Sequence, residues 1–212
     1  KKEILSKDPD AFIYRKGIKF NTSGSSGIPV SVDYTKKALI RNLAYSSIQR
    51  KNIKKIVGKG KKIFIVRPVN AEQTSYKIEN ELKKILWIPK VLKKGKLKYF
   101  SILDPVKDLY KKIQKEEALI VGTYGSFVDE FAQYCKKSNK RPIYPKAFTY
   151  SSDSCSVNSV KYLREIGINV IGTYNCVESQ VIAYQKEPLG DYIVHLGAVA
   201  LRTNSKNDCL IT

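Results

Sequence analysis

The chain has 212 residues, and its hydrophobic fraction of 42% is enough to fill the core of one substantial domain or two small ones. No apolar run approaches the roughly 18 to 20 residues of a membrane span, and the first residues do not form the apolar segment of a signal peptide, so we expect a globular, cytoplasmic protein. The net charge of +20 raises the alternative of nucleic-acid binding, but the excess is mostly lysine spread over 36–146, which favours a solvated surface.

The first elements surround a loop rich in glycine and serine. Short strands are predicted at 18–20 and 30–32, one on each side of this loop. Apolar residues at three-and-four spacing predict an amphipathic helix over 35–50, and the apolar run 62–66 predicts a buried strand. The following region is less clear and contains one predicted helix at 78–86.

From residue 104 onward, helices and strands alternate. Asp104 is predicted to cap a helix that has Pro105 at its first position. Strands are predicted at 118–122, 146–150 and 169–174. The helices of this part place apolar residues on one side: Val106, Leu109 and Ile113; Phe127, Phe131 and Cys135; and Val160, Leu163 and Ile166, closed by Gly167.

This alternation indicates the fold class. Short apolar strands separated by helices of roughly ten residues imply right-handed crossovers, and so an α/β fold with a mainly parallel sheet and helices on both faces. Further short strands are predicted at 191–194 and 209–211. Ligands of such sheets bind beyond the carboxyl ends of the strands, where 151–153 and 174–178 are expected to lie.

The cysteines and the single histidine do not suggest a metal site or a catalytic nucleophile. No Cys-x-x-Cys pair is present, and no cysteine or serine has an evident base other than His195. We expect buried, reduced thiols at the four cysteines, which are Cys135, Cys155, Cys176 and Cys209.

The loop between the first two strands carries the strongest chemical signal. Its glycines allow backbone N–H groups to turn inward, and its hydroxyls, from Thr22, Ser23, Ser25 and Ser26, add donors suited to phosphate oxygens. A flexible linker has the same composition, so the residues alone leave both interpretations open. The loop is not a Walker motif, because no Gly-Lys-Ser/Thr follows it.

Four segments in order resemble motifs of the acyl-adenylate-forming superfamily. Thr22-Ser-Gly-Ser-Ser-Gly-Ile-Pro29 resembles its Thr-Ser-Gly-Ser/Thr-Ser/Thr-Gly-x-Pro phosphate loop, and Tyr174-Asn-Cys-Val-Glu178 resembles its Tyr-Gly-x-Thr-Glu motif. Thr123-Tyr-Gly-Ser126 and Tyr150-Ser-Ser-Asp-Ser154 lie where the phenylacetate-CoA ligase and capsule-biosynthesis branch has a Thr-Pro-Ser-Tyr-like and a Gly-Ala-Glu-like turn. The end of the chain, 208–212, is similar to that branch's Gly-Glu-Leu-Val-x-Thr strand.

The resemblance implies a nucleotide site with ATP and Mg²⁺. In the family, the loop holds the β and γ phosphates, the tyrosine of the later motif packs on adenine, and the glutamate of that motif coordinates magnesium. Tyr174 and the metal ligand Glu178 take the last two roles by resemblance. From its position alone, Glu178 also fits a solvated loop residue or a helix cap. The implied nucleotide-binding residues are Thr22, Ser23, Gly24, Ser25, Ser26, Gly27, Ser152, Asp153, Tyr174, Asn175 and Glu178.

The implied activity is that of an ATP-dependent acid–thiol ligase. A small-molecule carboxylate is activated as acyl-adenylate and transferred to coenzyme A or an acyl carrier protein; no catalytic residue is assigned. Asn175 and Val177 replace the glycine and threonine of the motif, and Asp153 replaces a glutamate. A catalytically degenerate nucleotide-binding member is therefore an alternative. Because the family's ribose-binding motif and lysine-bearing C-terminal domain do not appear, we expect 1–212 to be a truncated, partial N-terminal adenylation core.

Overall fold

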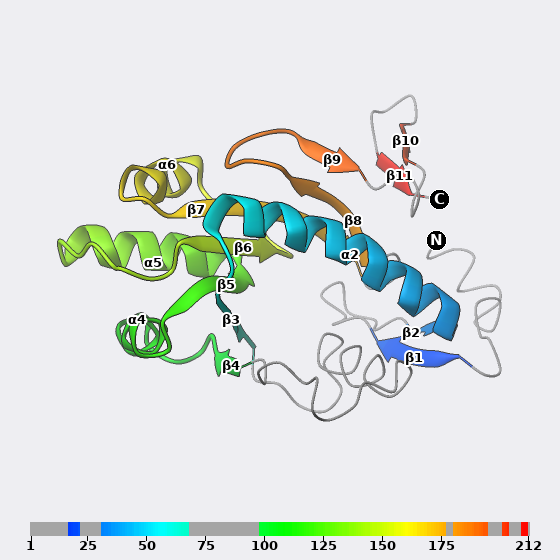
Figure 1. The fold of residues 1–212 in the computed structure, drawn as a ribbon, viewed down its shortest axis with the longest axis horizontal. Coiled ribbons are helices and arrows are strands. Elements are labelled where there is room, and N and C mark those ends of the chain that lie inside the picture. The colour runs from blue at the N-terminus through cyan, green and yellow to red at the C-terminus, as the bar shows by residue number, and fades with distance from the viewer. Residues whose placement is uncertain are drawn as a thin grey trace.

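A computed structural model describes residues 17–21, 31–67, 98–176, 180–194, 201–203 and 209–211. Within these ranges, the largest unit is a seven-stranded sheet with strand order β4-β3-β5-β6-β7-β8-β9 (Figure 1). Two antiparallel pairs accompany it. One joins β1 (Ile18–Asn21) to β2 (Ser31–Tyr34), and the other joins β10 (Leu201–Thr203) to β11 (Cys209–Ile211).

The main sheet is mostly parallel, as the alternation of elements predicts. Its first five strands in spatial order, from β4 to β7, pair in parallel, whereas β8 and β9 add an antiparallel edge. The sequence did not predict β4, β8 or β10, but it located the other strands to within a few residues. The strands of the sheet are β3 (Lys61–Val66), β4 (Lys98–Ser101), β5 (Ala118–Tyr124), β6 (Ala147–Ser151), β7 (Asn169–Cys176), β8 (Gln180–Gln185) and β9 (Tyr192–Val194).

Helices cover both faces of the sheet. On one face, α4 (Val106–Lys115), α5 (Gly125–Lys137) and α6 (Val157–Glu165) pack side by side, and α2 (Lys36–Val57) crosses the other face (Figure 1). Successive residues of a strand point to opposite faces. Accordingly, Val121 of β5 belongs to the core under the three helices, whereas its neighbour Ile120 packs with Ile53 of α2. The predicted fold class is confirmed.

The predicted core positions of α4 are confirmed, but its predicted cap is wrong. Leu109 and Ile113 are fully buried against the sheet. The N-cap position is held by Pro105, and no side chain caps the helix. Asp104 instead forms an ion pair with Lys112, with 2.6 Å between its carboxylate and the ammonium group. The Asp104 carboxylate thus pairs with a charged side chain two turns into the helix and does not bind the backbone N–H groups at the start of the helix.

The long helix α2 begins where predicted and extends further than predicted. Thr35 is its N-cap and accepts a hydrogen bond from the N–H of Ala38 at 3.2 Å. The helix continues past residue 50 because Ile53 is buried against the sheet, and it ends before Gly58, whose φ of +82° favours glycine. The predicted helix at 78–86 lies outside the described residues. Among those described, we find no helix of the length and hydropathy that a membrane crossing requires.

At the amino ends of the strands, one acid joins two lysines. Glu116, which precedes β5, forms ion pairs with Lys61 of β3 and with Lys98 of β4, the latter at 2.6 Å. Hydrogen bonds from Lys61 and then Lys98 lower the pKa of Glu116 to about 2. This triad neutralises part of the basic charge where three parallel strands begin.

Candidate functional site

The carboxyl ends of the parallel strands bring together three of the segments that the sequence singled out. Because β5, β6 and β7 run in parallel, their carboxyl ends lie at the same edge of the sheet. At these ends lie 123–126, 150–154 and, within β7 itself, the described part of the third motif, 174–176. The described residues of the segments expected at the carboxyl ends, 151–153 and 174–176, therefore lie at one edge of the sheet.

The first two turns are held together by Asp153. Its Oδ1 accepts a hydrogen bond from the N–H of Gly125, and its Oδ2 accepts one from the N–H of Ser126 at 3.2 Å. Both N–H groups belong to the first turn of α5, which has no cap from its own N-cap residue Tyr124. A carboxylate at this end of a helix satisfies unpaired N–H groups and complements the positive end of the helix dipole.

Gly125 allows the two turns to approach this closely. A Cβ atom at Gly125 would lie 2.3 Å from the carbonyl oxygen of Ser154 and 2.9 Å from that of Asp153. Both contacts are with backbone, which cannot rotate away as a side chain can. The start of α5 and the turn after β6 can therefore touch only if this residue is glycine.

A second carboxylate links the same two elements in the opposite direction. Asp129, one turn into α5, accepts hydrogen bonds from the N–H of Ser156 at 3.0 and 3.2 Å, and the Cys155 thiol donates to it at 3.6 Å. Ser156 is the N-cap residue of α6. No sequence signal pointed to Asp129, because nothing in the pattern of a helix shows that one of its polar residues reaches the next loop.

Between these contacts, Ser152 has an unusual backbone conformation. Its φ is +78°, in the left-handed region that residues other than glycine rarely adopt. Such a conformation costs on the order of 1 to 3 kcal/mol and persists only where the surroundings impose it. Ser152 is exposed, and it is one of the predicted nucleotide-binding residues.

The third segment presents an exposed aromatic ring. Tyr174 lies near the end of β7 and is 51% exposed, and Asn175 beside it is also exposed. The pairing of β7 with β8 shifts register between these two residues. Just before them, the Thr173 hydroxyl donates to the carbonyl oxygen of Tyr150 at 2.9 Å and so ties β7 to β6. Tyr174 is therefore placed beside the turn that Asp153 secures, with its ring available to a ligand.

Sequence reasoning missed a polar cluster that links β7, β8 and β9. Gln185 of β8 accepts a hydrogen bond from the N–H of Gly172 at 2.7 Å and donates to the carbonyl oxygen of Gly190 at 2.9 Å. A Cβ atom at Gly172 would lie 2.1 Å from the hydroxyl oxygen of Tyr192. Burial, followed by the neighbouring Tyr192, raises the pKa of Tyr150. The only sequence signal for this packing was a glycine inside a strand, which often marks a close approach.

The polar side chains of this edge do not form a nucleophilic site within the described residues. Burial, followed by the charge of Asp129, raises the pKa of the Cys155 thiol to about 12, so the thiol is protonated at neutral pH. Thr123, at the end of β5, is buried, and its hydroxyl has no hydrogen-bond partner. These groups can orient a ligand, but they do not supply a reactive thiolate.

Two predicted parts of the site cannot be placed. The residues of the phosphate loop and the predicted metal ligand lie outside the described ranges: Thr22, Ser23, Gly24, Ser25, Ser26, Gly27 and Glu178. The strands β1 and β2 on either side of the loop are present and pair with each other. Within the part of the chain that the structure describes, no three His, Cys, Asp or Glu side chains are grouped to hold a metal ion.

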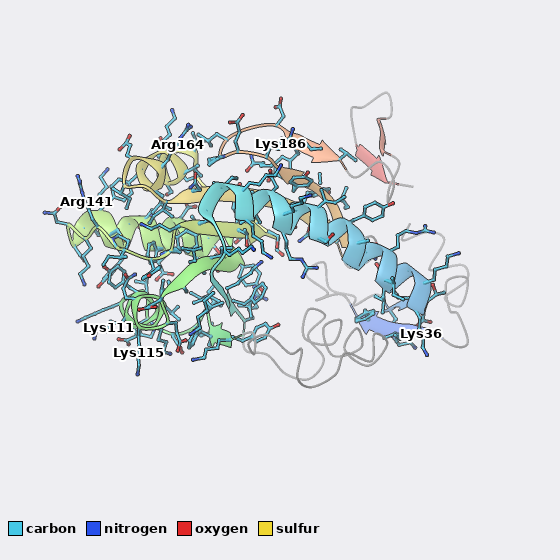
Figure 2. All side chains as sticks on the ribbon, viewed as in Figure 1. Lys36, Lys111, Lys115, Arg141, Arg164 and Lys186 are labelled. Atoms are coloured by element: carbon cyan, nitrogen blue, oxygen red, sulfur yellow. The ribbon has the colours of Figure 1, made fainter. Side chains whose placement is uncertain are left out.

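Six basic side chains of the described residues are labelled in Figure 2. Figure 2 shows Lys36 at the start of α2, Lys111 and Lys115 on α4, and Arg141 after α5, toward different ends of the molecule. A nucleic-acid interface requires many cations along one groove or face, so that they can neutralise successive phosphates. The cations labelled among the described residues are not lined up in this way in the view of Figure 2.

No protein-family model matches the chain, and no curated protein matches it in sequence. Solved structures do match its fold. An open conformation of 2-hydroxyisobutyryl-CoA ligase, in complex with 2-HIB-AMP and CoA, superimposes with a TM-score of 0.63 at 11% identity, over 97% of this chain and 49% of the ligase.

Two further matches are of the same kind. O-succinylbenzoate coenzyme A synthetase from Bacillus subtilis, in complex with ATP and magnesium, has a TM-score of 0.57 at 14% identity, over 91% of this chain and 38% of the synthetase. A long-chain-fatty-acid-CoA ligase from Archaeoglobus fulgidus has a TM-score of 0.57 at 14% identity, over 92% of this chain and 39% of the ligase. The chain thus has the fold of part of these ligases and spans less than half of their length.

Proposed function

We propose that the chain is the nucleotide-binding core of an adenylate-forming ligase. The observation that carries this proposal is the meeting of the turns after β5 and β6 with the end of β7 at one edge of the sheet, where Asp153 joins the two turns and Tyr174 of β7 stands exposed beside them. These are the segments that resemble the superfamily's motifs, and they keep their order in a fold shared with coenzyme A ligases. The activity is the ATP-dependent activation of a carboxylate as acyl-adenylate, followed by transfer to a thiol.

In this proposal, different residues bind different parts of the nucleotide. Tyr174 stacks on adenine, with Ser152, Asp153 and Asn175 around the adenosine half. The loop at 22–27 holds the phosphates, and Glu178 binds the magnesium ion that accompanies them. An exposed tyrosine ring beside a fixed turn fits a flat base. Positioning and charge neutralisation, rather than a covalent nucleophile, then accelerate the reaction.

The substrate and the acceptor are narrower proposals. The acceptor is coenzyme A or an acyl carrier protein, and the carboxylate is a small molecule. The phenylacetate-CoA ligase and capsule-biosynthesis branch remains the proposed relationship, because its Gly-Ala-Glu-like turn corresponds to the turn secured by Asp153. We also propose a cytoplasmic location, where ATP and coenzyme A are available. The basic surface would attract these polyanions.

A catalytically degenerate nucleotide-binding protein is the second candidate. The observation that favours it is Asn175, exposed at the register shift of β7 where the family has glycine. Isotope exchange between pyrophosphate and ATP, in the presence of a carboxylate mixture, separates the two functions. Exchange supports the ligase, whereas nucleotide binding without exchange supports the degenerate protein.

Thermal unfolding with and without Mg-ATP tests nucleotide binding itself. A ligand at about 100 times its dissociation constant stabilises the folded state by roughly 2.7 kcal/mol, which raises the melting temperature by about 5 to 10 °C in a domain of this size. Ser23→Ala combined with Ser25→Ala should remove this shift. Ser47→Ala combined with Ser138→Ala, at an exposed serine of α2 and the exposed serine that follows α5, is the matched control and should retain it.

The role of Glu178 is tested through magnesium. Triphosphate brings about four negative charges, and loop hydroxyls and N–H groups offer only partial charges, so a divalent cation is required to neutralise the rest. Glu178→Gln should therefore abolish the magnesium dependence of ATP affinity and leave the melting temperature of the ligand-free protein unchanged. An identical magnesium response in wild type and variant would remove Glu178 from the site.

A further inference from the structure

Asp153 stands among the residues proposed to surround the nucleotide, yet both of its carboxylate oxygens already have partners in the protein. Oδ1 accepts from the N–H of Gly125, and Oδ2 accepts from the N–H of Ser126 at 3.2 Å. A carboxylate that caps a helix in this way is held by charge-assisted hydrogen bonds and by the helix dipole. Binding a metal ion or a ligand directly would require it to give up contacts that it already makes.

We propose that Asp153 is a positioning residue, which fixes the turn after β6 on the start of α5 and so holds Ser152 in the conformation that receives the adenosine half of the nucleotide. This inference rests on the proposed function, and it replaces the direct contact between Asp153 and the nucleotide that the sequence resemblance implies. The ligand class is a nucleotide with an adenine base and a ribose.

The turn is fixed at both of its ends. At its start, the Tyr150 carbonyl oxygen accepts a hydrogen bond from the Thr173 hydroxyl at 2.9 Å. At its end, Asp153 is bound to α5. Ser152 lies between these anchors with its φ of +78°, a conformation that a serine would leave if one anchor were released. Losing the Asp153 anchor should therefore change the backbone of Ser152 in particular.

The length of the side chain fits this role. Gly125 lets the carbonyl oxygen of Ser154 come close to the start of α5, and the short aspartate reaches the helix across the remaining space. A glutamate, longer by one methylene, would push the turn away from the helix while keeping the same charge. Asp153, which stands where the family has a glutamate, thus has the side-chain length that this contact requires.

The chain supplies a matched control at the same contact between α5 and the segment after β6. Asp129 lies in α5 itself and holds the segment after β6 through a single backbone N–H group, that of Ser156 at the start of α6. Both carboxylates contribute hydrogen bonds between the same two elements. Only Asp153 is next to Ser152. If Asp153 has a purely structural role, replacing either aspartate should change AMP affinity equally. If Asp153 positions the nucleotide, its replacement should lower AMP affinity more than that of Asp129.

The experiment measures AMP and tripolyphosphate binding to the full chain by isothermal titration calorimetry, for wild type, Asp153→Asn and Asp129→Asn. For Asp153→Asn, we expect AMP affinity to fall by about tenfold or more, a change of about 1.4 kcal/mol, while tripolyphosphate, which has no base or ribose, binds as before. Asp129→Asn should lower the melting temperature of the protein about as much as Asp153→Asn does, but it should leave AMP affinity within about threefold of wild type.

Each other outcome has a definite meaning. If wild type binds neither AMP nor ATP, the proposed function fails and this inference fails with it. If wild type binds AMP and Asp153→Asn binds it equally well, or if both variants lose affinity equally, the proposed function stands and the positioning role is overturned. Should Asp153→Asn fail to fold, Asp153→Ser retains a cap that can accept one of the two N–H groups, and the same selective loss of AMP affinity is required of it.

Discussion

The two edges of the main sheet both use carboxylates, but they use them differently. At the amino edge, Glu116 is paired with the ammonium groups of Lys61 and Lys98. At the carboxyl edge, Asp153 and Asp129 are paired with backbone N–H groups at the starts of α5 and α6. Lysine side chains are long and rotate freely, whereas backbone N–H groups have fixed positions. The amino edge is therefore neutralised, and the carboxyl edge is held in one geometry.

This difference shows which edge of the sheet has a fixed geometry. Ion pairs with exposed lysines contribute little to stability and tolerate small displacements, so they suit an edge that only begins the strands. Backbone caps fix the turns after β5 and β6 relative to each other. The exposed Tyr174 and the left-handed Ser152 are found at the fixed edge. Four experiments test the contrast, in order of decreasing expected effect.

The largest expected effect is at Gly125. Gly125→Ala places a methyl group against the Ser154 and Asp153 carbonyl oxygens, so we expect a loss of about 3 kcal/mol in the free energy of unfolding. Gly58→Ala, at the end of α2 before the amino edge, meets no neighbouring atom and should lose only about 1 kcal/mol, from its φ of +82°. Denaturant titration measures both. Equal losses would show that the approach of the two turns is not tight.

The next effect is at Asp129. Asp129→Asn leaves one acceptor oxygen for the N–H of Ser156 and removes the negative charge near the start of α6, which should cost about 1 to 2 kcal/mol. The loss should be nearly independent of salt, because the partner is backbone. Chemical denaturation at low and high ionic strength measures it. A loss that disappears in high salt would place Asp129 in the same class as Glu116.

A smaller effect is expected at Glu116, and it should depend on pH. Its pKa is lowered from 4.5 to about 2 in the folded protein, so its contribution is present above pH 4.5 and is lost as the pH falls through 2. Glu116→Gln should therefore be less stable than wild type at pH 7, and the difference should shrink below pH 4.5. Thermal melts between pH 7 and pH 2 measure this difference. A constant difference over that range would contradict the ion-pair assignment.

The smallest effect concerns the reactivity of Cys155 rather than stability. Because burial and Asp129 raise the pKa of its thiol to about 12, it should react with iodoacetamide at pH 8 at least about tenfold more slowly than an unperturbed thiol. In Asp129→Asn, the rate should rise, since the negative charge of Asp129, one of the causes of the raised pKa, is removed. Mass spectrometry of the labelled peptide follows the reaction. Rapid labelling in wild type would show that the carboxyl edge is open at this point.

The predicted elements were correct where the chain repeats an apolar pattern. Phe127, Phe131 and Cys135 recur at helical spacing, and all three are buried in α5. The strand β8 was missed, because its residues follow the Tyr174 motif and carry no clear alternation. Asp104 was predicted as a cap from its place before a proline, but a lysine two turns away competes successfully for its carboxylate. The residues next to Asp104 in the sequence do not show which of the two partners its carboxylate will bind.

The sequence by itself determined the order of the elements and the identity of the turns that carry the motifs. Those features depend on neighbouring residues, whose spacing sets the helix or strand and its buried side. Only the tertiary structure decided what the turns do to one another. Asp153 meets Gly125 across 28 residues, and Tyr192 reaches Gly172 across β8, because parallel register and strand order bring them together. The geometry of the carboxyl edge is therefore a property of the assembled sheet.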